Sequence, residues 1–167
     1  AVARVPGVEV AVACSRDAER AARFARVIGA RSSSGDLPAL LASGAVDAVY
    51  VGTPNSLHLA QATDAVRAGL HVLVEKPATL RAADFATLVA EADAAGVVVL
   101  EGMRSAYDPG TAAVRALLPR LGTLRLASLR YCQRSSRYDL VLAGERVNIF
   151  DPALGGGALN DLGVYCV

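Results

Sequence analysis

The sequence predicts an α/β protein whose first part is a Rossmann-like, doubly wound parallel sheet. Three observations predict this fold: short apolar strands alternate with helices, the connections are only a few residues long, and the strands are continuously apolar. Parallel strands need crossover helices, and such helices normally cover both faces of the sheet. We therefore expect a Rossmann-like domain over residues 1–108 with both sheet faces buried.

Four apolar runs rich in β-branched residues predict the strands of this domain. They are Val8–Cys14, Val46–Val51, His71–Val74 and Val97–Leu100. The intervening helices are predicted from helical spacing of apolar residues, from capping side chains at their starts and from glycines at their ends. They are Asp17–Ile28 capped by Ser15, Leu37–Ser43 capped by Asp36, a helix capped by Ser56 that ends at Gly69, and Leu80–Ala95.

The pattern changes near Tyr107, which predicts a second domain over residues 109–167. After a helix at Thr111–Leu118, the segment Thr123–Gln133 alternates leucine with arginine and serine. Such alternation is typical of a strand with one solvated face, so we expect the start of an α+β domain with a mainly antiparallel sheet. A polar loop then leads to Gly155–Gly157, which we interpret as a flexible entry to a last helix from Ala158.

Composition excludes several classes of function. The chain has 17 basic and 16 acidic residues without a basic run, which argues against nucleic acid as a partner. No apolar run approaches the roughly 20 residues that cross a bilayer, so we expect neither a membrane span nor membrane association. Three cysteines without CxxC spacing are expected as reduced thiols in a cytoplasmic protein, and with only two histidines we expect no metal site.

A phosphate-binding G-x-G-x-x-G turn, which usually follows the first strand of this fold, is missing from the sequence. Residues 1–5 have the character of a helix end and Pro6-Gly7 that of a turn, so the run at Val8–Cys14 behaves as the second strand. In the usual strand order the first strand is central. We therefore expect a fragment whose first strand is missing, with a gap in its sheet and a truncated second domain.

Four motifs then occur in a characteristic order. They are SRD at Ser15–Asp17, VGTPNSLH at Val51–His58, AGLHVLVEKP at Ala68–Pro77 and GGGALNDLGVY at Gly155–Tyr165. Together they resemble the Gfo/Idh/MocA family of NAD(P)-dependent oxidoreductases, and most of all its branch of dimeric dihydrodiol dehydrogenases, NADP-dependent xylose dehydrogenases and glucose–fructose oxidoreductases. The resemblance covers nearly the whole chain.

The resemblance implies a role for the charged residues that end the third predicted strand. The carboxyl end of a parallel strand faces the ligand crevice. In the family, the lysine matching Lys76 lies near nicotinamide and substrate, the glutamate matching Glu75 contacts the cofactor, and Pro77 fixes the backbone beside them. The alternative is an exposed lysine at a strand end that pairs with Glu75.

Tyr165 is the predicted acid/base residue, as in the related branch. A hydride leaves a C–OH carbon only if the hydroxyl proton is also removed. A free tyrosine has a pKa of about 10, and a nearby ammonium such as that of Lys76 would lower it. Asp161, one helical turn from Tyr165, is predicted to orient the substrate. The alternative is that both are ordinary residues of a half-buried helix.

Further residues are predicted to bind the cofactor. Ser15 and Arg16 directly follow the predicted strand Val8–Cys14. An acidic residue at this position would favour NAD, whereas an arginine suits the 2′-phosphate of NADP. We expect NADP, with NAD as the second choice, or else only a serine cap and a solvated arginine. Thr53, Pro54 and Asn55 match the cofactor-lining turn of the family. His58 either joins this turn or is a satisfied helix histidine, and Arg104 matches a family position near the active site and is assigned to the substrate.

The predicted function is hydride transfer between nicotinamide and a CH–OH carbon of a sugar or cyclic diol, in a protein that forms a homodimer at full length. The rival prediction is a non-catalytic dinucleotide-binding or regulatory protein of the same fold. A third concerns residues 1–167 alone, which we expect to be inactive without the pyrophosphate-binding turn.

Overall fold

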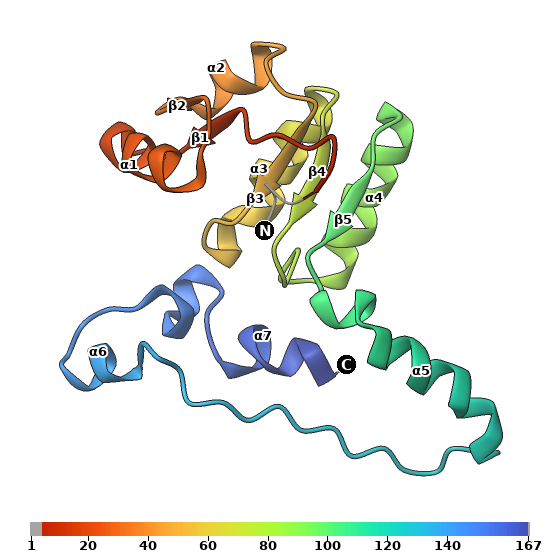
Figure 1. The fold of residues 1–167 in the computed structure, drawn as a ribbon. Coiled ribbons are helices and arrows are strands. Elements are labelled where there is room, and N and C mark those ends of the chain that lie inside the picture. Colours follow the sequence, from red (N-terminus) through yellow and green to blue (C-terminus); the bar gives the residue numbers. More distant parts are fainter. Residues whose placement is uncertain (1–4, 167) are drawn as a thin grey trace.

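The computed structural model of the chain describes residues 5–166 and contains two parallel sheets (Figure 1). The first sheet pairs β1 (Val12–Cys14) with β2 (Ser32–Ser34). The second has the order β3 (Ala48–Val51), β4 (His71–Val74), β5 (Val99–Glu101), again with every pair parallel. These ladders confirm the predicted parallel α/β fold.

Helices connect the strands and form nearly all the regular structure after β5. The α-helices are α1 (Ala18–Ile28), α2 (Leu37–Ala42), α3 (Asn55–Arg67), α4 (Ala82–Ala95), α5 (Pro109–Leu117), α6 (Tyr138–Leu142) and α7 (Ala158–Asp161). Short 3-10 helices are η2 (Arg104–Tyr107), η3 (Leu118–Leu121), η4 (Asn148–Phe150), η5 (Pro152–Leu154) and η6 (Gly163–Cys166). Most predicted elements are therefore present, with ends shifted by a few residues.

The sheet is interrupted between β1 and β3. Within residues 5–166 no ladder joins the two sheets, and this is where the sequence predicts a gap. The predicted helix end over residues 1–5 falls almost entirely outside the described residues, while the turn at Pro6-Gly7 is present and closes with the amide of Val8 donating to Val5. Strand β2 was not predicted, because its three serines lack the apolar character by which strands are recognised.

The core lies on one face of the three-stranded sheet. Helices α3 and α4 cover this face, and Figure 1 shows both behind the strands. Val51, Val72 and Val74 of β3 and β4 belong to this core, to which α4 contributes Leu88. Alternate strand residues point to opposite faces, so this single layer of helices buries every second side chain.

The opposite face of the same sheet is open, which corrects the prediction that both faces are covered. Tyr50 is 59% exposed, and Leu73 and Leu100 beside it are also exposed. The continuously apolar strands indicated burial on both faces, but the described residues place helices on one face only.

Two predicted helix caps are wrong by a few residues, and one is confirmed. Asp17, not Ser15, caps α1, where its carboxylate accepts from the amide of Arg20. Helix α3 begins just after Pro54, so Ser56 lies inside it. Asp36 caps α2 as predicted, because its Oδ1 accepts from the amide of Ala39.

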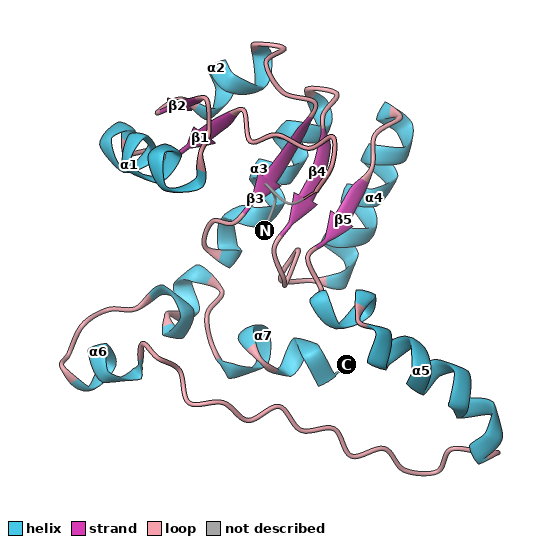
Figure 2. Cartoon of the chain, viewed as in Figure 1, coloured by secondary structure: helices cyan, strands magenta, loops and turns pink. Residues whose placement is uncertain are grey.

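No antiparallel sheet forms in the described part of the second predicted domain, which corrects the prediction for residues 123–133. This segment is extended but unpaired, and its leucines are exposed (Figure 2). Alternation of polar and apolar residues makes a strand only where a neighbouring strand supplies hydrogen bonds, and none does so within residues 5–166. The chain beyond it returns beneath the carboxyl ends of β3 and β4, which brings α7 to the sheet (Figure 1). The proposed boundary near residue 108 remains a prediction.

Candidate active site

The Glu75-Lys76-Pro77 turn begins where β4 ends, at the carboxyl edge of the parallel sheet. The Lys76–Pro77 peptide bond is cis, and the amide of Ala78 donates to the carboxylate of Glu101 at the end of β5. The Lys76 side chain is only 15% exposed. The fold therefore holds this lysine at the edge where parallel sheets bind their ligands.

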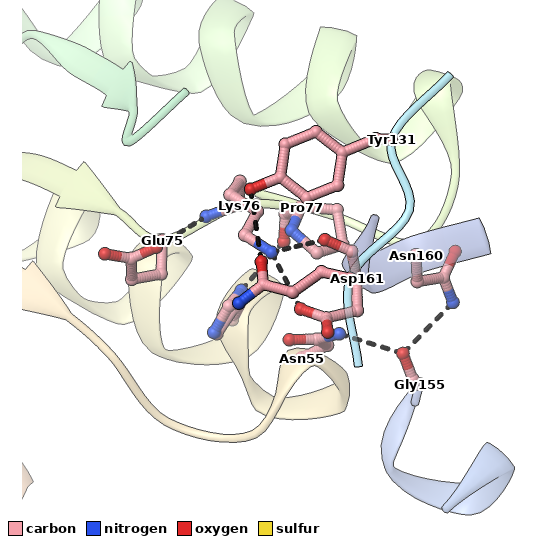
Figure 3. A network of polar contacts seen from close by, with 10 residues as sticks. Asn55, Glu75, Lys76, Pro77, Tyr131, Gly155, Asn160 and Asp161 are labelled. Carbon is pink, nitrogen blue, oxygen red and sulfur yellow. Dashed lines mark hydrogen bonds and ion pairs between the residues drawn. The ribbon is translucent and has the colours of Figure 1, made fainter. Parts of the chain in front are cut away.

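Lys76 meets Asp161 and Tyr165 of the C-terminal segment, and Figure 3 shows its contact with Asp161. Its Nζ donates to the main-chain oxygen of Asp161 over 2.5 Å and to Oδ1 of the same residue over 2.8 Å. The same Nζ lies 4.9 Å from the centre of the Tyr165 ring. The structure thus gathers the three residues predicted to be catalytic.

Tyr131 belongs to this cluster, although no motif in the sequence includes it. Its ring stacks on that of Tyr165 with the ring centres 4.9 Å apart and the planes 18° from parallel. Stacked aromatic pairs add about 1 kcal/mol beyond the burial of their surface. The sequence gives no sign of this contact, because Tyr131 lies in the segment 123–133, whose alternating pattern predicts a strand.

The predicted single helix carrying Asp161 and Tyr165 is divided in two. Helix α7 ends at Asp161 and η6 begins at Gly163. The amide of Tyr165 donates to Leu162, three residues earlier, instead of to the fourth residue back. The side chains of Asp161 and Tyr165 still line the same cavity, although each comes from its own short helix.

Gly155–Gly157 is a packed turn, which corrects its interpretation as a flexible entry. The Gly155 carbonyl accepts from the side-chain amides of Asn55 and Asn160, at 2.8 and 3.0 Å (Figure 3). The amides of Gly156 and Gly157 donate to main-chain oxygens of the preceding 3-10 turns. Asn55, predicted to line the cofactor site, thereby docks the C-terminal segment onto the start of α3.

The other residues of the predicted cofactor turn are joined through His58. Its Nδ1 lies 2.8 Å from the Pro77 carbonyl oxygen and its Nε2 lies 2.8 Å from that of Thr53. The Thr53 hydroxyl donates to Oε1 of Gln61. Pro54 precedes α3 directly. The ring of His58 is buried behind the turn, which agrees with the alternative of a satisfied helix histidine.

Glu75 points towards the open face of the sheet, where the Tyr50 hydroxyl donates to its Oε1. Burial of the phenol, followed by the hydrogen bond to Glu75 and its negative charge, raises the pKa of Tyr50 to about 12. The other carboxylate oxygen of Glu75 accepts from the Lys76 amide. Tyr50 therefore orients Glu75, and no motif in the sequence indicated this role.

Ser15, Arg16 and Arg104 lie away from the Lys76 cluster. Ser15 and Arg16 follow β1 in the smaller sheet, where the amide of Ser15 donates to Ser34. The exposed guanidinium of Arg16 has no ion pair with any residue in the described range 5–166. Arg104 is exposed in η2 and does not line the cavity that contains Lys76.

A cavity of about 680 Å³ adjoins the cluster, and polar and apolar residues share its wall. Arg134, Arg137, Tyr138 and Phe150 line this cavity together with Lys76. The complete lining is Lys76, Tyr131, Gln133, Arg134, Ser135, Ser136, Arg137, Tyr138, Ile149, Phe150, Gly157, Ala158, Asp161, Leu162 and Tyr165. The volume is in the usual range for small-molecule sites.

The described residues offer neither a cluster of metal ligands nor a helix that could span a membrane. Residues 5–166 contain no group of three His, Cys, Asp or Glu side chains placed to hold a metal ion. None of the helices in that range is both long and apolar enough to span a membrane.

The family of this chain follows from the match of its first 103 residues. They match the Gfo/Idh/MocA oxidoreductase family, described by its NAD-binding Rossmann fold. The chain belongs to this family. The motifs therefore predicted the family correctly, and the chain is partial in length against its relatives, because it spans about half the length of the curated proteins it matches.

Two curated relatives illustrate the range of activities. The chain is 40% identical over 153 residues to the NADP(+)-dependent scyllo-inositol 2-dehydrogenase of Bacillus subtilis (strain 168), covering 92% of this chain and 47% of that protein. It is 32% identical over 161 residues to human trans-1,2-dihydrobenzene-1,2-diol dehydrogenase, covering 95% of this chain and 46% of the relative. The second belongs to the branch that the motifs indicated.

A solved structure shows the same fold with a cofactor bound. A 3-ketoreductase from Actinomadura kijaniata, in complex with NADP and TDP-benzene, aligns with a TM-score of 0.66 and 35% identity over 71% of this chain and 36% of the relative.

Proposed function

We propose that the protein containing this chain is an NADP-dependent dehydrogenase that transfers a hydride between nicotinamide and a CH–OH carbon of a sugar or cyclic diol. Membership of an NAD(P)-binding oxidoreductase family supports the general reaction. The observation that carries the specific proposal is the contact of Lys76 with Asp161 and with the ring of Tyr165. A protein that only binds a dinucleotide has no need for this cluster.

Tyr165 is the proposed acid/base residue. Its phenolate oxygen takes the proton from the substrate alcohol during oxidation, and its hydroxyl gives the proton back during reduction, while a bound nicotinamide would supply the hydride chemistry. The positive charge of Lys76 stabilises the phenolate that forms when the proton moves. Asp161 holds the ammonium in place through its hydrogen bonds, and its exposed second oxygen can orient a substrate hydroxyl.

Residues at the carboxyl edge of the strands fit the nicotinamide half and the 2′-phosphate of NADP. Thr53, Pro54 and Asn55 after β3, and Glu75 and Pro77 after β4, would hold the nicotinamide half. His58 would support both turns from behind. Ser15 and Arg16 after β1 would bind the 2′-phosphate. The guanidinium of Arg16 has no ion pair within the described residues, so it can donate to this phosphate. NAD is the alternative cofactor.

The proposed substrate enters the cavity beside Lys76 and Tyr165. Its wall carries hydroxyl, amide and guanidinium groups, which suit a molecule with several hydroxyls. We also propose that Arg104 contacts the substrate and that the whole protein forms a homodimer.

The test is a titration with NADPH and NADH, followed by nicotinamide fluorescence, on the longest natural chain that contains these residues. We expect tighter binding of NADPH. Replacing Arg16 by alanine should weaken NADPH binding by about tenfold, the value of one charged hydrogen bond, and leave NADH unchanged. Arg20→Ala is the matched control, because Arg20 is an exposed arginine of the adjacent helix α1.

Equal affinity for both nucleotides, or equal effects of the two arginine substitutions, would overturn the assignment of NADP. Turnover is then measured with a panel of sugars and cyclic diols. Binding without turnover on any of them would favour the rival proposal of a dinucleotide-binding protein that is not an enzyme.

A further inference from the structure

His58 is the most deeply buried polar residue of the described chain, and it contacts two carbonyl oxygens. Its side chain lies in the first turn of α3, and the residue is 1% exposed. Nδ1 and Nε2 each lie 2.8 Å from a main-chain oxygen, the first from Pro77 and the second from Thr53. A carbonyl oxygen can only accept, so each nitrogen needs its own hydrogen to form a bond.

We propose that His58 is doubly protonated and that it clamps the turn after β3 to the turn after β4. A neutral ring has one N–H and one lone pair, and the lone pair would then face a carbonyl oxygen at 2.8 Å. A doubly protonated ring donates at both nitrogens. Hydrogen bonds from a charged donor are roughly twice as strong as neutral ones, which offsets part of the cost of burying the charge.

The clamp lies directly behind the proposed active site, and its functional meaning rests on the proposed function. Thr53 belongs to the turn assigned to the cofactor, and Pro77 directly follows Lys76. A shift of either turn would move the nicotinamide site relative to the lysine. His58 is therefore a positioning residue, which holds two turns from neighbouring strands at a fixed separation without touching substrate.

The other histidine of the chain provides an internal reference, since the sequence has two. Nδ1 of His71 accepts a hydrogen bond from the Val98 amide over 3.0 Å. That nitrogen cannot carry a hydrogen, so the contact requires a neutral ring with its hydrogen on Nε2. The two histidines of one protein are thus expected to differ in protonation state under the same conditions.

The test is a nitrogen-15 NMR measurement of both imidazole rings at neutral pH, on the unsubstituted protein. We expect both nitrogens of His58 to show the shift of a protonated ring nitrogen. His71 should show one protonated nitrogen and one bare nitrogen. A bare ring nitrogen at His58 would overturn the proposal, whatever the outcome for catalysis.

A pair of substitutions tests the positioning role. His58→Leu removes both hydrogen bonds, His58→Gln keeps one amide donor group, and His71→Leu is the matched control. We expect NADPH binding to weaken by about tenfold in His58→Leu, to recover partly in His58→Gln and to stay unchanged in His71→Leu. Equal affinity of His58→Leu and the unsubstituted protein would overturn the positioning role.

The two proposals fail in distinguishable ways. If the unsubstituted protein binds no dinucleotide, the proposed function fails, and the NMR result alone then decides the clamp. If His58→Leu does not fold, the amide shifts of Thr53 and Lys76 in His58→Gln replace the binding measurement, with His71→Gln as the control. Perturbation of both amides by His58→Gln alone supports the clamp, and no perturbation contradicts it.

Discussion

The ammonium of Lys76 donates to the carboxylate of Asp161 over 2.8 Å, although 85 residues separate the two along the chain. The main-chain oxygen of Asp161 accepts a second bond from the same ammonium. The lysine side chain is 15% exposed, so the pair is partly shielded from water. Asp161 thereby determines where the charge of Lys76 lies relative to Tyr165.

Asp161→Asn should lower turnover and leave cofactor affinity nearly unchanged. Asparagine keeps the main-chain contact and the side-chain shape but removes the negative charge that holds the ammonium. We expect kcat to fall by about tenfold, corresponding to the loss of one charged hydrogen bond. Steady-state kinetics and the NADPH titration provide the two measurements.

The matched control is Glu91→Gln, which removes the negative charge from an exposed ion pair with Arg67, and neither residue lines the cavity beside Lys76. Exposed pairs contribute little, so kcat should not change. Equal losses in the two variants would contradict the special role of Asp161.

Tyr165→Phe should abolish most turnover while leaving the fold intact. Phenylalanine keeps the ring that stacks on Tyr131 and lies beside Lys76, and it removes only the hydroxyl. Loss of a general acid/base group typically costs about a hundredfold or more in rate. Tyr138→Phe is the control, because Tyr138 lines the same cavity without contacting Lys76 in the described structure. A Tyr165→Phe variant with full kcat would remove the tyrosine from the mechanism.

Gly155→Ala should destabilise the docking of the C-terminal segment. Gly155 has a φ of 71°, and an added Cβ would lie 2.8 Å from Cδ2 of Leu80 and 3.1 Å from Cβ of Asn55. Gly144→Ala is the control, since its φ of 82° carries a similar strain but nothing lies within 4 Å. The difference between the variants isolates the steric clash.

We expect Gly155→Ala to lose about 1–3 kcal/mol more than Gly144→Ala in the free energy of unfolding, the usual cost of overpacking. Chemical denaturation measures this difference. Similar losses in both variants would show that the segment does not pack on α3 and Leu80 in solution.

The Tyr50–Glu75 hydrogen bond predicts a loss of stability in alkali. The pKa of Tyr50 is raised to about 12 in the folded protein, against about 10 in an unfolded chain. The unfolded state therefore loses this proton first, and the stabilisation present below pH 10 is lost as the pH rises from 10 to 12. Tyr50→Phe should remove this contribution to the slope of unfolding free energy against pH.

Tyr107→Phe is the control for this experiment, because Tyr107 is an exposed tyrosine that contacts only a main-chain oxygen in the described residues. Denaturation series between pH 9 and pH 12 on the three proteins give the comparison. The same alkaline slope in Tyr50→Phe and in the unsubstituted protein would count against the hydrogen bond.

Local chemistry in the sequence determined the parallel α/β fold and the family. The strand His71–Val74 was predicted with its observed bounds, and Asp36 was identified as the cap of α2. Glycines after α1 and α4 adopt the left-handed conformation expected at helix ends. These features depend on residues close together in the chain, so the sequence carries enough information to predict them.

Only the tertiary structure decided which residues meet and which predicted surfaces are covered. Local alternation over residues 123–133 could not show that no strand within residues 5–166 pairs with it, and the apolar strands could not show that helices in that range cover only one sheet face. The stack of Tyr131 on Tyr165 and the clamp of His58 between two turns likewise depend on contacts distant in sequence. The energy of such a contact depends on how separate elements pack in space, which local propensity and spacing do not determine.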